Sequence, residues 1–376
     1  MLVGAGHAHV EVLRSFAERP PADITLTLVT RSRHAPYSGM LPGLIAGLYQ
    51  EDETRIDTLA LAQAAGAEIV QASADGIDTA GRHLACEGRP PISYDVLSFD
   101  IGSTTDLSGI PGAGEHSIPV RPIDSFSQRF EALRRRALSG RGVTRIAVVG
   151  GGAAGVELVL SVAHRLRADA ASSGACLEFV LVSGTASIFP DFVPSFGDRF
   201  KTVLKERGIA LVTGASVVAV EPGRLIVEGR PAVPADIVLW VTGAAAPKWL
   251  RSTSLPLDAN GFISVEPTLR VQGIDNIFAA GDIASFTPRG LAKSGVYAVR
   301  EGPVIARNIR RLLAGKPLEE YRPQRNTLYL VSTGTRHAIG TRNGIVLAGN
   351  WVWHFKDWID RRWISRYRTV RGSSED

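Results

Sequence analysis

The chain has 376 residues, of which 45% are hydrophobic and 21% are charged, and its formal net charge is +5. This composition is typical of a folded α/β protein of two or three domains, and it excludes an intrinsically disordered chain. No uninterrupted apolar run approaches the roughly 18 residues that a membrane-spanning helix needs.

The basic residues and the cysteines exclude further classes of protein. Arginines cluster at residues 134–136, and basic residues recur from residue 356 to 371. Because no nucleic-acid-binding motif accompanies them, we expect no nucleic-acid partner. The chain opens on a strand instead of a signal peptide, and Cys86 and Cys176 belong to no motif. We therefore expect a cytoplasmic protein without a disulfide framework, a redox-active cysteine pair or a metal site.

The first predicted unit is a short strand, a glycine-rich turn and a helix. Apolar residues 1–3 lead into Gly4-Ala-Gly6-His-Ala-His9, and a helix follows over residues 9–18. In such a turn Gly4 permits the tight bend, and Gly6 lets the backbone approach a pyrophosphate at the helix N-terminus. His9 stands at the third glycine position of the pattern, and we interpret it as a packing residue.

The next strand, at residues 24–30, should end at the adenosine ribose of the first nucleotide. An acidic residue usually accepts the ribose hydroxyls there, but Thr30 and Arg31 occupy the place, which weakens an NAD assignment for this unit. The loop at residues 34–43 is apolar and rich in turn residues, as a segment covering a flat cofactor would be. Strands are predicted within residues 68–84 and 94–102, and a linker at 109–114.

A second nucleotide unit follows a helix at residues 125–138. Its strand at 146–149 runs into Gly150-Gly-Gly152-Ala-Ala-Gly155, which satisfies the complete dinucleotide pattern before a helix at 156–166. The following strand, 177–183, ends at Ser183. An acid at this position would favour NADH, and an arginine after it would favour the 2′-phosphate of NADPH. Because the sequence has neither, it does not distinguish the two nucleotides. A helix at 193–207, strands within 210–227 and a strand at 236–241 complete the unit at Gly243.

Residues 276–282 then form a buried strand that ends on an acid and returns to the first unit. We predict an α/β fold with two Rossmann-like domains, in which the second nucleotide-binding domain interrupts the first. The first domain comprises residues 1–115 and 244–320, the second 116–243, and a C-terminal region with an amphipathic helix 321–376. Two dinucleotide turns in one chain indicate electron transfer between two dinucleotides.

These segments together resemble the pyridine nucleotide–disulfide oxidoreductase superfamily over about residues 1–315. The resemblance implies that the first domain (residues 1–115 and 244–320) is the FAD-binding domain and that the NAD(P)-binding domain (116–243) interrupts it. The missing cysteine pair points within it towards enzymes like the type II NADH dehydrogenases. Residues 4–10, 36–43, 94–103 and 356–362 also resemble the flavoprotein region fused to selenide, water dikinase in some bacteria. This chain looks like a stand-alone member.

The resemblance implies roles for individual residues. Asp282 would hydrogen-bond the ribityl-phosphate region of FAD, and Pro42 would line the flavin ring. Lys293 would place positive charge near the flavin, or is an exposed residue before a helix. Glu157 would position the nicotinamide of NADH or NADPH, or serves as an acid favoured in the first helical turn.

The acceptor is left open between a quinone and another small molecule. Residues 296–302 lack the glutamines that line the quinone site of type II NADH dehydrogenases, which counts against a quinone. Two further hypotheses are reduction of a selenium or sulfur compound, and a flavoprotein that senses redox state without turnover.

The tail at residues 350–367 is rich in aromatic and basic residues. At 100° per residue one broad face is expected to carry Trp351, Val352, Phe355, Trp358, Ile359 and Trp363. Such a helix suits peripheral contact with the cytoplasmic membrane face. The alternatives are packing against the flavin domain or against a second subunit in a homodimer.

Overall fold

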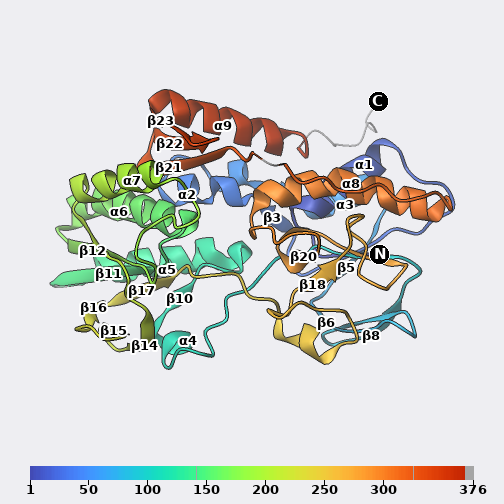
Figure 1. Cartoon of the computed structure of the whole chain (residues 1–376), viewed down its shortest axis with the longest axis horizontal. Coiled ribbons are helices and arrows are strands. Elements are labelled where there is room, and N and C mark those ends of the chain that lie inside the picture. Colours follow the sequence, from blue (N-terminus) through green and yellow to red (C-terminus); the bar gives the residue numbers. More distant parts are fainter. Residues whose placement is uncertain (141, 325, 369–376) are drawn as a thin grey trace.

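The computed structural model describes residues 1–140, 142–324 and 326–368, and it contains two parallel β-sheets that lie side by side along the longest axis (Figure 1). The basic run predicted to extend to residue 371 ends outside the described residues. The first sheet has the order β19-β9-β1-β2-β5 and the second β10-β17-β11-β12-β13. Each sheet is covered by helices, as parallel strands require because they are buried on both faces.

The first sheet is assembled from distant parts of the chain. Its strands are β1 (Leu2–Val3), β2 (Thr27–Thr30), β5 (Glu68–Gln71), β9 (Leu97–Phe99) and β19 (Ile277–Ala279). Val3 pairs with both Val29 and Phe99, and Ala279 pairs with Phe99. The return of the chain to the first sheet after the second unit is therefore as predicted.

Three helices pack on the first sheet: α1 (His7–Glu18), α3 (Thr58–Ala64) and α8 (Gly295–Leu313). Helices α1 and α8 cross closely at Gly302, where a Cβ atom would come within 2.7 Å of the Ala8 carbonyl oxygen. A glycine is required there because the two backbones touch.

The second sheet forms from one continuous stretch. Its strands are β10 (Ile118–Pro119), β11 (Val143–Val149), β12 (Cys176–Val182), β13 (Ile209–Val212) and β17 (Ile237–Trp240). Helices α5 (Phe126–Leu138), α6 (Ala153–Ser173) and α7 (Pro194–Glu206) cover it. Helix α6 is longer than predicted and ends at Gly174, whose φ of +72° is the left-handed conformation that closes a helix.

Each unit also contains smaller sheets. The range 68–84 includes β5 and two strands of an antiparallel sheet, β6 (Ala74–Asp78) and β7 (His83–Cys86), whose third strand, β8 (Arg89–Ser93), was not predicted. The range 210–227 includes most of β13 and the antiparallel strands β14 (Val217–Glu221) and β15 (Arg224–Val227), and β16 (Val233–Pro234) follows outside it. Two short pairs are antiparallel β3 (His34–Pro36) with β4 (Arg55–Asp57), and parallel β18 (Ile263–Val265) with β20 (Ala284–Phe286). The predicted linker at 109–114 leads into α4 (Ala113–His116).

The C-terminal region contains a sheet that the sequence analysis missed. Strands β21 (Tyr329–Thr335), β22 (His337–Arg342) and β23 (Ile345–Gly349) form an antiparallel meander before helix α9 (Asn350–Ser365). Figure 1 shows this region, in red, lying across both parallel sheets. Gly334 of β21 approaches α6 so closely that a Cβ atom would lie 2.4 Å from the Leu160 carbonyl oxygen.

Candidate functional site

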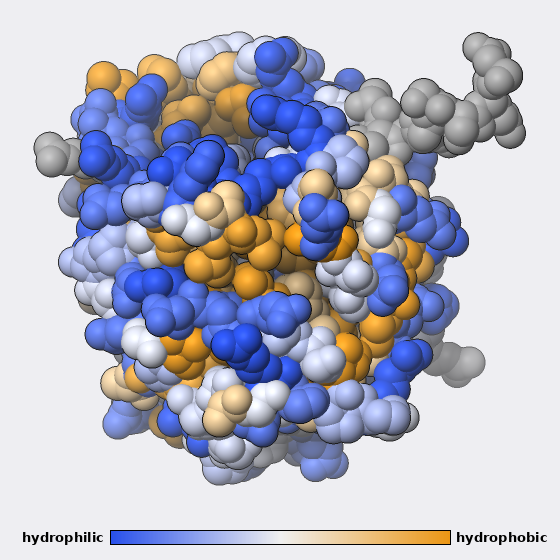
Figure 2. Space-filling model, turned by 90° about the vertical axis from the view of Figure 1, so that its right-hand side faces the viewer, coloured by the Kyte–Doolittle hydropathy of each residue, from blue (hydrophilic) through white to orange (hydrophobic). Residues whose placement is uncertain are grey.

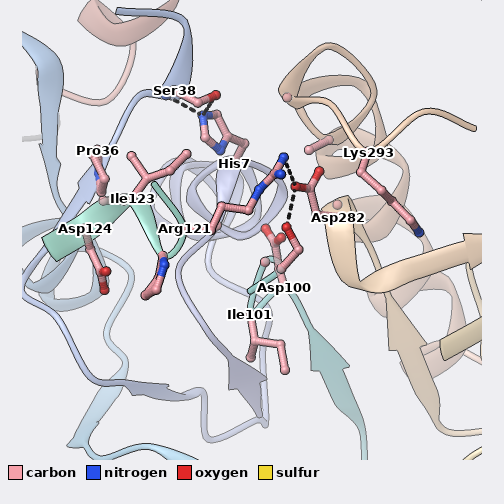
Figure 3. A pocket seen from close by; sticks show the side chains of 18 of the residues that line it. His7, Pro36, Ser38, Asp100, Ile101, Arg121, Ile123, Asp124, Asp282 and Lys293 are labelled. Atoms are coloured by element: carbon pink, nitrogen blue, oxygen red, sulfur yellow. Dashed lines mark hydrogen bonds and ion pairs between the residues drawn. The ribbon is translucent and has the colours of Figure 1, made fainter. Parts of the chain in front are cut away.

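A cavity of about 1040 Å³ opens where the carboxyl ends of both parallel sheets meet. Ligands of open α/β sheets bind at this edge. The predicted site residues on its wall are Gly4, Gly6, Thr30, Arg31, Pro42, Glu157, Asp282 and Lys293. Figure 3 shows part of this wall, with His7, Asp100 and Asp282 converging from different elements.

The first glycine turn is shaped by the loop after β9. Gly4 has a φ of +85°, and a Cβ atom there would lie 2.4 Å from the Asp100 carbonyl oxygen. A Cβ atom on Gly6 would lie 2.3 Å from Asp100 Oδ1. His9 is buried, and its ring nitrogens contact the Gly4 carbonyl oxygen at 2.7 Å and Ser98 Oγ at 2.8 Å. The imidazole thus joins strand and helix where the pattern expects a glycine.

Asp100 is a site residue that the sequence analysis missed. Its Oδ2 atom accepts hydrogen bonds from the backbone N–H groups of Ala8 (2.8 Å) and His9 (2.9 Å) in the first turn of α1. Burial raises the pKa of Asp100 to about 7, although these two hydrogen bonds act in the opposite direction. The only sequence signal was its place at the end of the predicted strand 94–102.

Asp282 lies on the same wall, in the short helix η5 (Gly281–Ile283) after β19. Its Oδ2 atom accepts a hydrogen bond from Ser103 Oγ at 2.9 Å and pairs with the Arg121 guanidinium at 3.4 Å. Behind it, Glu301 accepts the Gly281 N–H at 2.6 Å, and burial raises the pKa of Glu301 to about 7. Three carboxyl groups therefore surround this end of the cavity.

Lys293 stands beside Asp282 but is turned away from it (Figure 3). Its ammonium donates to the Ala284 carbonyl oxygen at 2.5 Å and lies 3.9 Å from the centre of the Phe262 ring. Burial lowers the pKa of Lys293. The role of Lys293 beside a flavin stays a prediction, because this contact holds the charge at the Phe262 ring.

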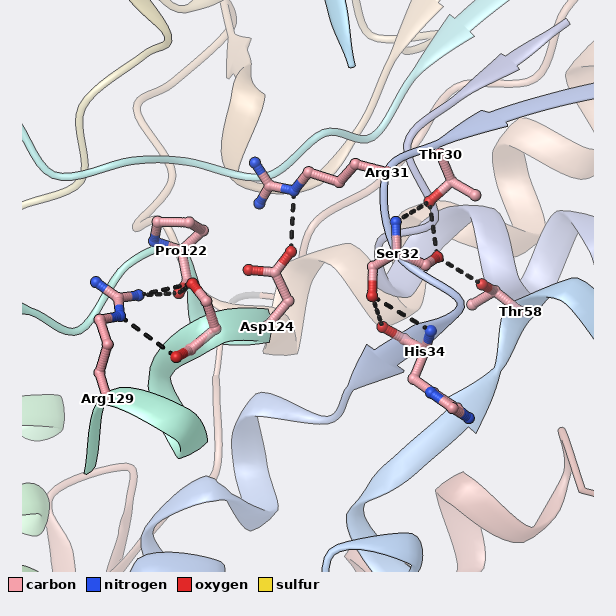
Figure 4. A network of polar contacts seen from close by, with 9 residues as sticks. Thr30, Arg31, Ser32, His34, Thr58, Pro122, Asp124 and Arg129 are labelled. Atoms are coloured by element: carbon pink, nitrogen blue, oxygen red, sulfur yellow. Dashed lines mark hydrogen bonds and ion pairs between the residues drawn. The ribbon is translucent and has the colours of Figure 1, made fainter. Parts of the chain in front are cut away.

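Thr30 and Arg31 lie at the carboxyl end of β2 (Figure 4). Thr30 Oγ1 donates to the Ser32 carbonyl oxygen at 3.1 Å. Arg31 Nε pairs at 2.9 Å with Asp124 of the 3₁₀ helix η3 (Ile123–Ser125), which precedes α5. This contact links the two nucleotide units at the place where an adenosine ribose was expected.

The second glycine turn has the geometry that its pattern predicts. Gly150 has a φ of +135°, and a Cβ atom on Gly155 would lie 1.9 Å from the Gly150 carbonyl oxygen. Gly155 thus lets the helix pack against the strand end. A Cβ atom on Gly152 would have no described protein atom within 4 Å, so the space above this turn is open.

Ser183 and Gly243 flank the second turn without lining the cavity. Ser183 is buried, and its hydroxyl contacts Thr185 Oγ1 at 2.9 Å. A Cβ atom on Gly151 would lie 2.2 Å from Ser183 Oγ, so this serine packs directly beneath the turn. Gly243 is exposed and lies three residues beyond the end of β17.

Glu157, in the first turns of α6, is half-buried and faces the C-terminal region. Its Oε1 atom accepts the Ser332 N–H at 2.7 Å. Burial raises the pKa of Glu157 to about 7, against the opposing effect of the Lys356 ammonium. Lys356 Nζ donates to Asp360 Oδ2 at 2.7 Å and to the Gly39 carbonyl oxygen at 2.6 Å.

Three aromatic rings from distant elements form one wall of the cavity. The ring centroids of Tyr37 and Trp363 lie 4.3 Å apart, and those of His7 and Trp363 lie 5.3 Å apart, both stacked. The Tyr37 hydroxyl donates to Asp360 Oδ1 at 3.0 Å. Helix α9 therefore contributes both aromatic and charged groups to the site, which the sequence analysis did not foresee.

The single apolar face predicted for the tail helix is wrong. Val352, Trp353, Lys356, Asp360, Trp363 and Ile364 are its buried residues. Trp351, Phe355 and Trp358 of the predicted face are exposed instead. The buried side of α9 includes an ion pair because it borders the polar cavity, and the aromatic residues are divided between two faces.

Comparisons with known proteins agree with this architecture. The sequence pattern described as pyridine nucleotide-disulphide oxidoreductase matches residues 1–302. The NADH dehydrogenase-like protein YutJ of Bacillus subtilis is 24% identical over 325 residues, which cover 86% of each chain. The type II NADH:quinone oxidoreductase of Staphylococcus aureus is 22% identical over 381 residues, covering 96% of this chain and 94% of that protein.

Among solved structures, NDH2 from Plasmodium falciparum in complex with NADH superimposes with a TM-score of 0.82. The alignment covers 100% of this chain and 98% of that one at 14% sequence identity. At this identity the likeness establishes the shared fold alone.

Proposed function

Because the chain belongs to the pyridine nucleotide-disulphide oxidoreductase family, it is an FAD-dependent NAD(P)H oxidoreductase, and we propose that it passes electrons to a quinone. One observation carries the proposal. A single cavity is bounded by Gly4 and Asp282 of the first unit and by Ala154 and Glu157 of the second. Two dinucleotides held by the two turns would meet in it.

The residues present fit both dinucleotides. Gly4 and Gly6 add no side chains of their own to the first turn, beside which the Asp100 carboxyl group lies, and the space above Gly152 is open for a pyrophosphate. We propose that residues 1–115 and 244–320 hold FAD and that residues 116–243 hold NADH or NADPH. When bound, FAD supplies the electron-transfer chemistry, and the protein supplies position and electrostatics.

The acceptor end of the cavity suits a flat molecule with polar oxygens. The stacked rings of Tyr37 and Trp363 offer an aromatic surface, and the nearby Lys356 ammonium is a hydrogen-bond donor. The name of the Staphylococcus aureus relative also supports a quinone. Glu157 would contact the nicotinamide, where the neutral acid and the carboxylate are both accessible near pH 7.

We propose further that the outer face of α9 contacts the membrane surface. Trp351, Phe355 and Trp358 are 57%, 42% and 55% exposed, and Ile345 and Leu347 of β23 are exposed as well. Figure 2 shows the side of the molecule that lies at the right in Figure 1, where apolar atoms gather in the centre and reach the upper edge. Such an exposed apolar patch is typical of an interaction site.

Basic groups beside this patch support a lipid surface as its partner. The Arg362 guanidinium lies 5.5 Å from the centre of the Trp358 ring. Among the basic residues of the tail, Lys356 is not available to lipid, because its ammonium is buried against Asp360. In the part of the chain that the structure describes, none of the helices could span a membrane. A second copy of this chain is the alternative partner of the same face.

The second candidate function is reduction of a selenium or sulfur compound. Residues 36–43 and 356–362 resemble the flavoprotein region associated with selenide, water dikinase. Both segments contribute residues to the wall of this cavity, which supports the candidate. A redox sensor without turnover is the third.

A panel of acceptors tests these candidates on the FAD-loaded full chain. Steady-state oxidation of NADH and NADPH is measured with a water-soluble quinone, with selenite, with a persulfide and with oxygen alone. Turnover that is fastest with the quinone supports the leading proposal, and turnover fastest with selenite or persulfide supports the second. If the protein retains FAD but shows negligible turnover with every acceptor, the result supports the redox sensor.

A further inference from the structure

Asp100 occupies hydrogen-bond donors that a dinucleotide turn normally leaves free. Its Oδ2 atom accepts the N–H groups of Ala8 and His9, and its backbone oxygen accepts the Gly6 N–H at 3.1 Å. In the second unit, no side chain among the described residues accepts a hydrogen bond from the first turn of α6. The two glycine turns therefore differ in charge: a carboxyl group is built into the first.

The second carboxyl oxygen of Asp100 faces the cavity. A Cβ atom on Gly6 would lie 2.3 Å from Oδ1, and one on Gly281 would lie 2.5 Å from it. The carboxyl group therefore fits only because both neighbouring residues are glycines. This atom makes no hydrogen bond with any described residue, and Asp100 is part of the cavity wall. Figure 3 shows the carboxyl group beside that of Asp282.

The groups around Asp100 do not compensate a negative charge. Asp282 and Glu301 are both acids that disfavour it, and the Arg121 guanidinium pairs with Asp282. His7 and His9 are neutral, because burial lowers the pKa of each imidazole to about 4. A pyrophosphate on this turn would bring two more negative charges next to the carboxyl group.

We propose that Asp100 takes up a proton from solvent when FAD binds, so that one proton accompanies each cofactor into the complex. The proton resides on Oδ1, where the neutral acid donates a hydrogen bond towards the cofactor phosphate. Oδ2 keeps the N–H groups of Ala8 and His9. The proposal rests on FAD binding in the first unit and adds to it a proton and the residue that holds it.

The direction of the pH dependence follows from burial. The pKa of Asp100 is raised to about 7 before FAD is present, so at lower pH the carboxyl group already holds its proton. Above pH 7 the proton must be taken up on binding, and the added phosphates raise the pKa further. The dissociation constant of FAD should therefore be constant below pH 7 and rise about tenfold per pH unit above it.

Dilution of the FAD-loaded full chain into buffers from pH 6 to pH 9 tests this, with dissociation followed by recovery of flavin fluorescence. We expect the dissociation constant of the unmodified chain to rise up to about 100-fold between pH 7 and pH 9. Asp100→Asn keeps an acceptor for Ala8 and His9 and adds a donor, so its profile should be flat. Glu301→Gln is the matched control and should keep the slope.

Calorimetry of FAD binding in two buffers of different ionisation enthalpy counts the proton directly, without any variant. About one proton per FAD at pH 8 is expected. The proposal would be overturned if the dissociation constant of the unmodified chain did not change with pH. It would also be overturned if the pH dependence persisted in Asp100→Asn, or if only Glu301→Gln abolished it. Failure to bind FAD at every pH would contradict the proposed function itself. A slope below pH 7 would assign the proton to His7.

Discussion

Lys356 and Asp360 form a buried ion pair one turn apart on α9, with 2.7 Å between Nζ and Oδ2. The same ammonium donates to the Gly39 carbonyl oxygen, and the Tyr37 hydroxyl donates to Asp360. The C-terminal helix is thereby fastened to the loop that lines the cavity. The tail helix, for which membrane contact and packing against the flavin domain were both expected, is thus part of the site wall.

Lys356→Met should destabilise the protein by about 3–5 kcal/mol, because it leaves the Asp360 carboxylate buried without its cation. Urea denaturation measures the free energy of unfolding. Lys201→Met removes an exposed partner of Asp198 and should change it by less than about 1 kcal/mol. Equal losses in the two variants would show that the buried pair contributes no more than a surface pair.

Gly152→Val should raise the KM for NADH and NADPH at least tenfold while FAD stays bound. The side chain enters the open space above the second turn, so it blocks a pyrophosphate without a clash in the protein. Steady-state kinetics and the flavin spectrum measure the two effects. Gly155→Val, which would clash with the Gly150 carbonyl oxygen, should instead fail to fold. Loss of FAD from Gly152→Val would mean that the two turns are assigned in reverse.

Asp282→Ala should weaken FAD retention by about 1.5–3 kcal/mol, the usual range for a hydrogen bond to a charged group. Ultrafiltration of the yellow protein, with the flavin in the filtrate quantified, gives the measurement. Asp275→Ala, at a highly exposed carboxyl group, is the control and should retain FAD normally. Unchanged retention in Asp282→Ala would remove this residue from the FAD site.

Glu157→Gln should become more stable relative to the unmodified chain as pH rises from about 4.5 to 7. Burial raises the folded-state pKa of Glu157 above its unfolded value, so folded protein holds a proton that the unfolded chain has released. Stability is therefore lost with rising pH in this window, and the amide cannot contribute to that loss. Urea denaturation at pH 4.5 and pH 7.5 measures the difference. A constant gap between the two proteins contradicts the expectation.

The double substitution Trp351→Ser and Trp358→Ser should reduce binding to anionic vesicles without a large loss of stability, because both side chains are exposed. Co-sedimentation at low and high salt measures binding, which should weaken as salt rises. Trp363→Ser, at a buried ring, should lower the melting temperature instead. Undiminished vesicle binding by the double variant, or its conversion from dimer to monomer, would assign this face to another partner.

The sequence predicted those parts of the fold that depend on local patterns. Apolar runs that end on a glycine indicate the strand–turn–helix units around Gly4 and Gly150. The apolar run that ends on Asp282 indicates β19, which returns to the first sheet. The β21–β23 sheet was missed, because Gly334 and Gly340 interrupt its apolar alternation and its stability comes from packing on α6 and α9.

The site was predicted less completely, because its key contacts join residues far apart in the chain. Asp100 accepts a hydrogen bond from Ala8 of α1, 92 positions away in the chain, and Tyr37 donates to Asp360, 323 positions away. No spacing in the sequence encodes such contacts. The helical periodicity of the tail also indicated one apolar face, whereas the cavity favours a buried ion pair.

The order of strands in the first sheet has a consequence for synthesis on the ribosome. Strand β9 pairs with β19, whose first residue, 277, follows the first residue of β9, 97, by 180 positions. At synthesis rates of about 5–20 residues per second, β19 emerges roughly 10–40 s after β9. The second sheet, complete once β17 has appeared, therefore closes first, and the edge of β9 waits unpaired beside it. The second parallel sheet can thus be completed before the first, although the first begins earlier in the chain.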